Sequence, residues 1–128
     1  MAIEWSEKFA TGNHEIDTQH RRLFDMLNNL ERRINDGESP SEMMDVFDDL
    51  VDYTKVHFAN EEQCIEVCAC STQGINNLAH HGFLRMLSSR LEHLRSQDPT
   101  LKVFKSLHGE LSDWVCTHIC RIDRALRL

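Results

Sequence analysis

Apolar residues recur at helical spacing through the middle of the chain. Between residues 43 and 68 the steps along one stripe alternate between four and three residues, which is typical of a helix that buries one face. The positions of this stripe are Met43, Phe47, Leu50, Thr54, His57, Glu61, Cys64 and Cys68. An imidazole and a carboxylate therefore take positions where the pattern predicts buried apolar side chains.

The carboxylate of Glu61 needs compensation, because burying a carboxylate without a partner is costly. A bound metal ion would supply that compensation and would also explain His57 one helical turn earlier. Alternatively, the stripe ends close to solvent at His57 and the helix is an ordinary member of a bundle. This helix taken alone favours neither interpretation.

The same spacing predicts three more helices, joined by short connections. They are expected over residues 17–35, over 75–96 and from 99 past 118, while the central helix runs from 40 to 68 or 70. The capping signals behind these bounds are Asp17 as an N-cap, Asp36-Gly37 as a stop, the capping box Ser39-Pro40-Ser41-Glu42, and Asp98-Pro99 as a start.

The first 16 residues are expected to form an extended arm. Trp5, Phe9 and Ile16 are its apolar anchors, and Gly12-Asn13 suggests a turn. Four helices of about 20 residues with short turns predict an all-α fold, an up-down-up-down four-helix bundle with an extended N-terminal arm. We expect residues 1–128 to form a single domain.

Composition narrows the class of protein. The net charge of -7 argues against nucleic acid or an anionic membrane as a partner. No apolar stretch approaches the roughly 20 residues of a membrane span, and we expect no signal peptide. We therefore expect a cytoplasmic protein.

The five cysteines, at positions 64, 68, 70, 116 and 120, fit neither a zinc-finger pattern nor a disulfide framework. One interpretation is a second metal or redox site, since two pairs lie one helical turn apart. The interpretation we favour is small buried hydrophobic residues in a reducing cell.

Each predicted helix carries one histidine on its buried stripe. These are His20, His57, His80 and His118. One such histidine is ordinary, but one in each helix points to a common site. The other four, His14, His81, His93 and His108, are expected at the surface.

Two carboxylates add to the four histidines. Glu61 lies one turn from His57, and Asp123 lies five residues beyond His118. Five helical steps rotate about 140° off the starting face, so Asp123 reaches the site only where the helix is distorted or ending. Imidazoles and carboxylates without thiolates suit iron, manganese or zinc, and two bridging carboxylates suit a pair of irons.

These residues resemble the bacterial hemerythrin family over nearly the whole chain. The similar segments are Gly12-x-x-x-Ile16-Asp17-x-Gln19-His20-x-x-Leu23 with Trp5 upstream, His57-Phe58-x-x-Glu61-Glu62, and Trp114-x-x-x-His118-Ile119-x-x-x-Asp123. The spacing of five between His118 and Asp123 is the one found in the family.

The resemblance implies a non-haem di-iron centre that binds molecular oxygen, with an oxo or hydroxo group as a third bridge between the irons. Glu61 and Asp123 would bridge both irons. His20 and His57 would hold the iron with the open position, and His80 and His118 the other. Leu23, Phe58, Trp114 and Ile119 match the family's apolar oxygen pocket.

One motif departs from the family, whose third motif is His-x-x-x-His-x-x-Phe. Here Asn76 stands at the first histidine, His80 at the second, and Phe83 supports that register. A shift by one residue would use His81 in place of His80, but His81 lies about 100° around the helix. We expect one iron to keep two histidines, with Asn76 or water in the remaining position, and iron occupancy to be incomplete.

Three functions follow from this pattern. The first is oxygen carriage, storage or sensing. The second is an enzyme-like di-iron site that turns over oxygen, peroxide or nitric oxide, favoured by an extra open position. The third is a redox or metal-handling protein in which cysteines such as Cys64 take part. We rank them in this order. An electron donor or a separate signalling partner is left unidentified.

Overall fold

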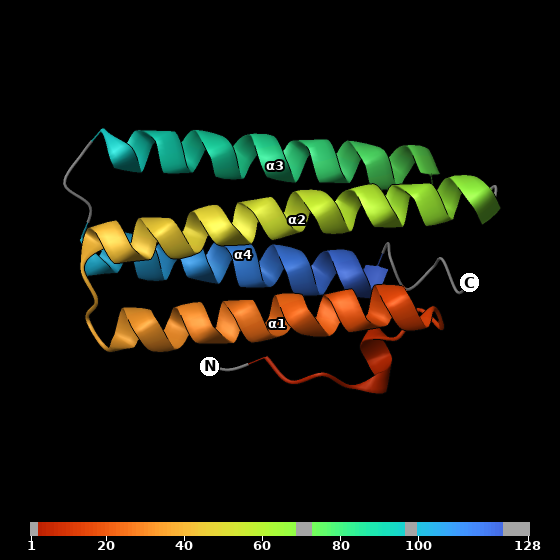
Figure 1. Ribbon diagram of the computed structural model, residues 1–128, viewed down its shortest axis with the longest axis horizontal. Coiled ribbons are helices and arrows are strands. Elements are labelled where there is room, and N and C mark those ends of the chain that lie inside the picture. Colours follow the sequence, from red (N-terminus) through yellow and green to blue (C-terminus); the bar gives the residue numbers. More distant parts are fainter. Residues whose placement is uncertain (1–2, 69–72, 97–99, 122–128) are drawn as a thin grey trace.

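Four helices make up the bundle in the computed structural model. The structure describes residues 3–68, 73–96 and 100–121. Within these ranges it does not describe the side chains at 64–68, 73–76 and 121. The helices are α1 (His14–Asn35), α2 (Pro40–Cys68), α3 (Gln73–Arg95) and α4 (Leu101–Arg121). Successive helices run in opposite directions along one long axis (Figure 1). The predicted up-down-up-down all-α bundle is therefore confirmed.

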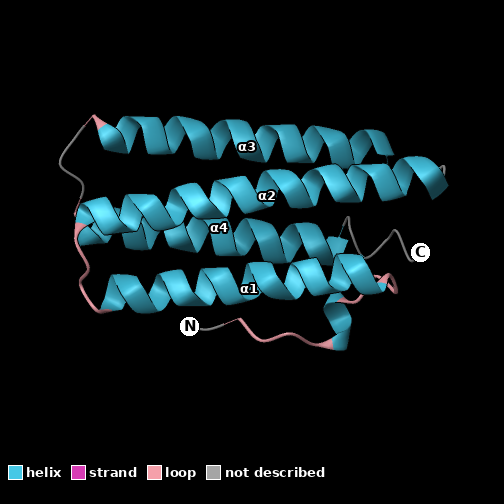
Figure 2. Ribbon diagram, in the orientation of Figure 1, coloured by secondary structure: helices cyan, strands magenta, loops and turns pink. Residues whose placement is uncertain are grey.

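Figure 2 shows helices joined by loops, and α1 packs against both α2 and α4 while α2 packs against α3. The core between them is built from large apolar side chains. Phe47 of α2 and Phe104 of α4 stack with ring centroids 5.9 Å apart at the end of the bundle where α2 and α4 begin. Within the described residues, no helix combines the length and apolar character needed to cross a membrane.

The N-terminal arm lies along α1 and includes a short 3-10 helix, η1 (Glu7–Phe9), that contacts α4. Phe9 is buried and meets Phe24 edge-on at a centroid distance of 4.9 Å. The backbone of Ile3 exchanges two hydrogen bonds with the Asn28 side chain, at 2.8 and 2.9 Å. Trp5 and Phe9 anchor the arm as predicted, with one helical turn added, whereas the third predicted anchor, Ile16, belongs to α1.

The start of α1 corrects the prediction that Asp17 is its N-cap. The helix begins at His14, which is exposed, and the side chain of Asn13 accepts a hydrogen bond from the Ile16 backbone at 3.0 Å. Asp17 instead accepts from the backbone and hydroxyl of Thr11, each at 2.8 Å. Both residues are good capping types, and the contact with buried Thr11 decides which of them caps.

The other helix ends are close to those predicted. Gly37 follows α1 with a φ of 73°, and the Ser39 hydroxyl accepts from the Glu42 backbone at 3.3 Å as α2 starts. The predicted start of α4 at Pro99 is wrong, because α4 begins at Leu101, where Thr100 caps the Val103 amide at 3.4 Å. Asp98 and Pro99 themselves lie outside the described residues.

His108 corrects a second prediction, that this side chain is at the surface. It is buried, and its Nε2 donates to the Leu27 carbonyl of α1 at 2.9 Å. Position 108 is one turn beyond Phe104 and therefore faces α1 at the edge of the apolar stripe. His81 and His93 are exposed, as expected.

We predict that Asn13→Ala lowers the free energy of unfolding by about 1 kcal/mol, because the Ile16 amide at the start of α1 loses its acceptor. Chemical denaturation measures the change. Asn35→Ala, an exposed site at the last residue of α1, is the matched control and should change stability by less than half as much. An Asn13→Ala protein as stable as this control would contradict the cap.

Candidate metal centre

Five polar side chains from all four helices meet inside the bundle. His20 comes from α1, His57 and Glu61 from α2, His80 from α3 and His118 from α4. Their exposed fractions are 0%, 1%, 0%, 1% and 5%, in that order. The sequence periodicity placed each of them on a buried stripe, and the structure brings all five together.

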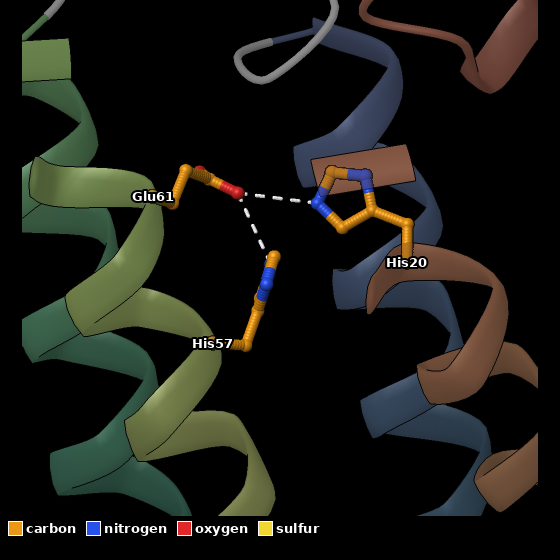
Figure 3. Close-up of side chains that lie close together, drawn as sticks. All are labelled: His20, His57 and Glu61. Atoms are coloured by element: carbon orange, nitrogen blue, oxygen red, sulfur yellow. Dashed lines mark hydrogen bonds and ion pairs between the residues drawn. The ribbon is translucent and has the colours of Figure 1, made fainter. Parts of the chain in front are cut away.

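The Glu61 carboxylate lies at the centre of this cluster. Its Oε2 is 3.1 Å from the Nε2 atoms of both His20 and His57, as Figure 3 shows. Its Oε1 is 3.3 Å from His80 Nε2 and 3.9 Å from His118 Nε2. Each oxygen therefore faces its own pair of imidazoles, and the carboxylate spans two groups of donors.

This donor set fits metal ions. His20, His57 and Glu61 form one group of possible ligand atoms lying within 4.8 Å of one another, and Glu61, His80 and His118 form a second. The Nε2 atoms of His80 and His118 are only 3.1 Å apart in the interior. Neutral imidazole nitrogens around a buried carboxylate offer lone pairs that a cation satisfies, and nitrogen and oxygen donors suit iron, manganese or zinc.

Two further side chains lie near the Nδ1 atoms of His57 and His80, on the side of each ring that faces away from Glu61. The Nδ1 of His57 donates to the Gln19 amide oxygen at 2.6 Å, and the Nδ1 of His80 lies 3.5 Å from Glu62 Oε1. Sequence reasoning assigned no role to Gln19 or Glu62, although both stand inside the family-like segments. The sequence offered one signal for both residues, which is that each directly neighbours a predicted ligand, His20 or Glu61. Whether such a neighbouring side chain contacts a histidine of another helix depends on how the helices pack.

A small apolar cavity of about 10 Å³ lies beside the histidines. That is close to the minimum space for one water-sized molecule. The four residues predicted for an oxygen pocket, Leu23, Phe58, Trp114 and Ile119, all line it.

Aromatic stacking fixes the two histidines of the second group. The Phe58 ring lies parallel to His80, with centroids 3.7 Å apart, and Trp114 stacks on His118 at 4.5 Å. Trp114 also stacks on Phe83, with centroids 4.1 Å apart. The orientation of both imidazoles is therefore set by packing as well as by polar contacts.

Other predicted site residues fall outside what is described. Asp123 lies beyond the described chain, and the side chains of Asn76 and Cys64 are not described, although their backbones belong to α3 and α2. Their roles at the centre stay predictions.

Cys116 and Cys120 are free thiols that line a hollow together with the arm residues Ile3 and Phe9. They do not line the cavity beside the histidines, as their helical positions indicated. Partial burial raises the pKa of the Cys116 thiol, which favours its neutral form.

A family model, the hemerythrin HHE cation binding domain, matches residues 11–126. The chain belongs to the hemerythrin family. Among its relatives, bacteriohemerythrin of Pseudomonas aeruginosa is 33% identical over 122 residues, covering 94% of this chain and 76% of that protein. Bacteriohemerythrin of Stenotrophomonas maltophilia is 30% identical, covering 96% and 78%.

The fold of this hemerythrin also matches a solved crystal structure of a leucine-to-phenylalanine mutant. The TM-score is 0.83 at 24% identity, covering 98% of this chain and 95% of that one. Together with the histidine and glutamate groups, family membership supports non-haem iron as the metal of this centre.

We predict that ferrous iron raises the melting temperature of the iron-free protein, because a folded donor set binds cations that the unfolded chain does not. Iron at about 100 times its dissociation constant adds roughly 2.7 kcal/mol for each occupied site. Anaerobic thermal melts with and without iron measure the shift. It should disappear in Glu61→Ala and persist in Glu92→Ala, an exposed site on α3. An iron-dependent shift unchanged by Glu61→Ala would exclude Glu61 as a ligand.

Proposed function

We propose that this hemerythrin is a di-iron protein that binds molecular oxygen reversibly, for carriage, storage or sensing. The observation that carries the proposal is the placement of Glu61, whose two carboxylate oxygens face two separate pairs of histidines. One carboxylate between two donor groups suits a pair of ions better than a single ion.

In this proposal each histidine pair would hold one iron. His20 and His57 would hold the first, His80 and His118 would hold the second, and Glu61 would offer one carboxylate oxygen to each. Asp123 is proposed as the second bridging carboxylate on its sequence position alone. When bound, two ferrous irons supply the electrons for reversible oxygen binding.

The apolar wall beside the histidines suits this function. Leu23, Phe58, Trp114 and Ile119 surround space for a small uncharged molecule. Such a wall excludes water and protons, which slows the escape of reduced oxygen species and favours release of oxygen itself. Its small volume excludes larger organic substrates from the same position.

A second candidate is a di-iron site that turns over oxygen, peroxide or nitric oxide. The observation in its favour is Asn76, which stands where the family pattern has a histidine. A weaker ligand there leaves one iron with a more labile position. For redox or metal handling by cysteines, the two cysteines whose side chains are described, Cys116 and Cys120, give no support, since they face the arm and not the cavity.

We predict that the reduced, iron-loaded protein develops a charge-transfer absorption band when oxygen is added and loses it when oxygen is removed. Anaerobic reduction followed by cycles of oxygen and argon in a sealed cuvette measures this reversibility. Carriage or sensing requires the band to return over repeated cycles. Rapid conversion to an oxidised form, with peroxide released or consumed, would instead support turnover.

We predict that Asn76→His increases the iron content per chain or slows autoxidation, because it restores an imidazole at the position of the missing family ligand. Iron analysis and the decay of the oxygen-dependent band measure the two effects. The control is Asn35→His, an exposed site at the end of α1. Equal iron content and equal autoxidation in wild type and Asn76→His would show that the site lacks no ligand.

A further inference from the structure

The two donor groups are backed by side chains of different charge. Behind His57 stands the neutral amide of Gln19, at 2.6 Å from Nδ1. Behind His80 stands the carboxylate of Glu62, at 3.5 Å from Nδ1. The groups resemble each other in geometry, with Nδ1 turned outward and Nε2 turned toward Glu61, yet they differ by one negative charge.

Glu62 lies on the side of His80 that faces away from the cluster. Its Oε1 is 3.5 Å from Nδ1, which is an ion-pair distance and not a hydrogen bond. A carboxylate at that distance attracts an N–H and repels a lone pair, so it favours the hydrogen on Nδ1. The Nε2 atom then presents its lone pair toward Glu61 and His118, at 3.3 and 3.1 Å. The charge of Glu62 therefore favours the tautomer that a metal ligand bound through Nε2 needs.

Glu62 also docks α3 onto α2 at this point. His80 belongs to α3, while Phe58, Glu61 and Glu62 lie within about one turn of α2. The Phe58 ring lies parallel to His80 within 3° at 3.7 Å, and Glu62 contacts its outer nitrogen. The imidazole is thus held on its face by an aromatic ring and at its edge by a carboxylate.

A negative partner does more than orient the ring. A carboxylate behind an imidazole makes it a stronger electron donor than an amide does, and a stronger donor favours the more highly charged metal ion. The Glu62 side chain is 31% exposed, so solvent weakens this effect without removing it. Gln19, being neutral, gives His57 no comparable increase.

We propose that Glu62 is a positioning residue for His80 that makes the His80/His118 position the one that oxidises first. This inference rests on the proposed di-iron centre and adds to it a difference in reduction potential between the two iron positions. The position held by His20 and His57, backed by the amide of Gln19, then keeps its ferrous state to a higher potential.

The test compares Glu62→Gln and Glu62→Ala in the full-length protein loaded with ferrous iron. Glu62→Gln keeps a polar oxygen beside Nδ1 but removes the charge, whereas Glu62→Ala removes both. Asp45→Asn, an exposed site on the same helix, removes an equal charge far from the histidines. Gln19→Glu places a charge behind His57 and serves as the reciprocal variant.

Two measurements separate orientation from charge. Chelator competition should show a 10- to 100-fold loss of iron affinity in Glu62→Ala, largely restored in Glu62→Gln. Redox titration should show the lower of the two midpoint potentials raised in both Glu62 variants, by about 59 mV for each tenfold loss of preference for ferric over ferrous iron. Gln19→Glu should lower the higher potential, and Asp45→Asn should move neither.

Failure of this inference can be told apart from failure of the proposed function. If the wild type takes up two irons and binds oxygen but the Glu62 variants match Asp45→Asn in affinity and potential, only the role of Glu62 is overturned. If the wild type takes up no iron, the di-iron proposal is overturned and this inference with it. A potential raised in Glu62→Ala but unchanged in Glu62→Gln would refute the role of charge.

Discussion

The arrangement of the four helices depends on the burial of one carboxylate, that of Glu61. Glu61 is fully enclosed, and a negative charge in such a place demands either protons or cations around it. The bundle meets that demand by bringing one imidazole from each helix to the same carboxylate. The register of all four helices is therefore tied to the position of Glu61. A change in how the helices pack would also change the arrangement of the donor atoms.

Much of this arrangement could be predicted because helical periodicity is a property of the sequence alone. The four inward histidines and Glu61 were found by their register on apolar stripes. His108 was misplaced because its acceptor is the Leu27 carbonyl, 81 residues away, which no local pattern reveals. The cap of α1 was wrongly assigned to Asp17. Both Asp17 and Asn13 are good capping residues, and the contact of Asp17 with Thr11, which leaves Asn13 as the cap, is not visible in the sequence.

The residues that tune the centre were harder to find than those that form it. Gln19 and Glu62 lie next to ligand positions in sequence, yet each contacts a histidine on a different helix. Contacts of that kind depend on how far one helix is rotated against its neighbour, which spacing does not specify. Family membership supports iron as the metal, and the departure at Asn76 is a feature of this chain, whereas Gln19 and Glu62 stand inside segments that resemble the family.

The stacked Phe47 and Phe104 rings lie at the end of the bundle where α2 and α4 begin, whereas Glu61 lies toward the other end of α2. That end is held by apolar packing together with polar contacts such as the Arg95–Asp48 ion pair, none of which needs a metal. The buried histidines and Glu61 leave donor atoms that a cation would satisfy, so the stability of their end depends on loading. In the metal-free protein we therefore expect the Phe47–Phe104 end to keep the four helices in register and the histidine end to open more easily. The slowest amide exchange is then expected at the Phe47–Phe104 end, with exchange at the histidine end slowing once metal is bound.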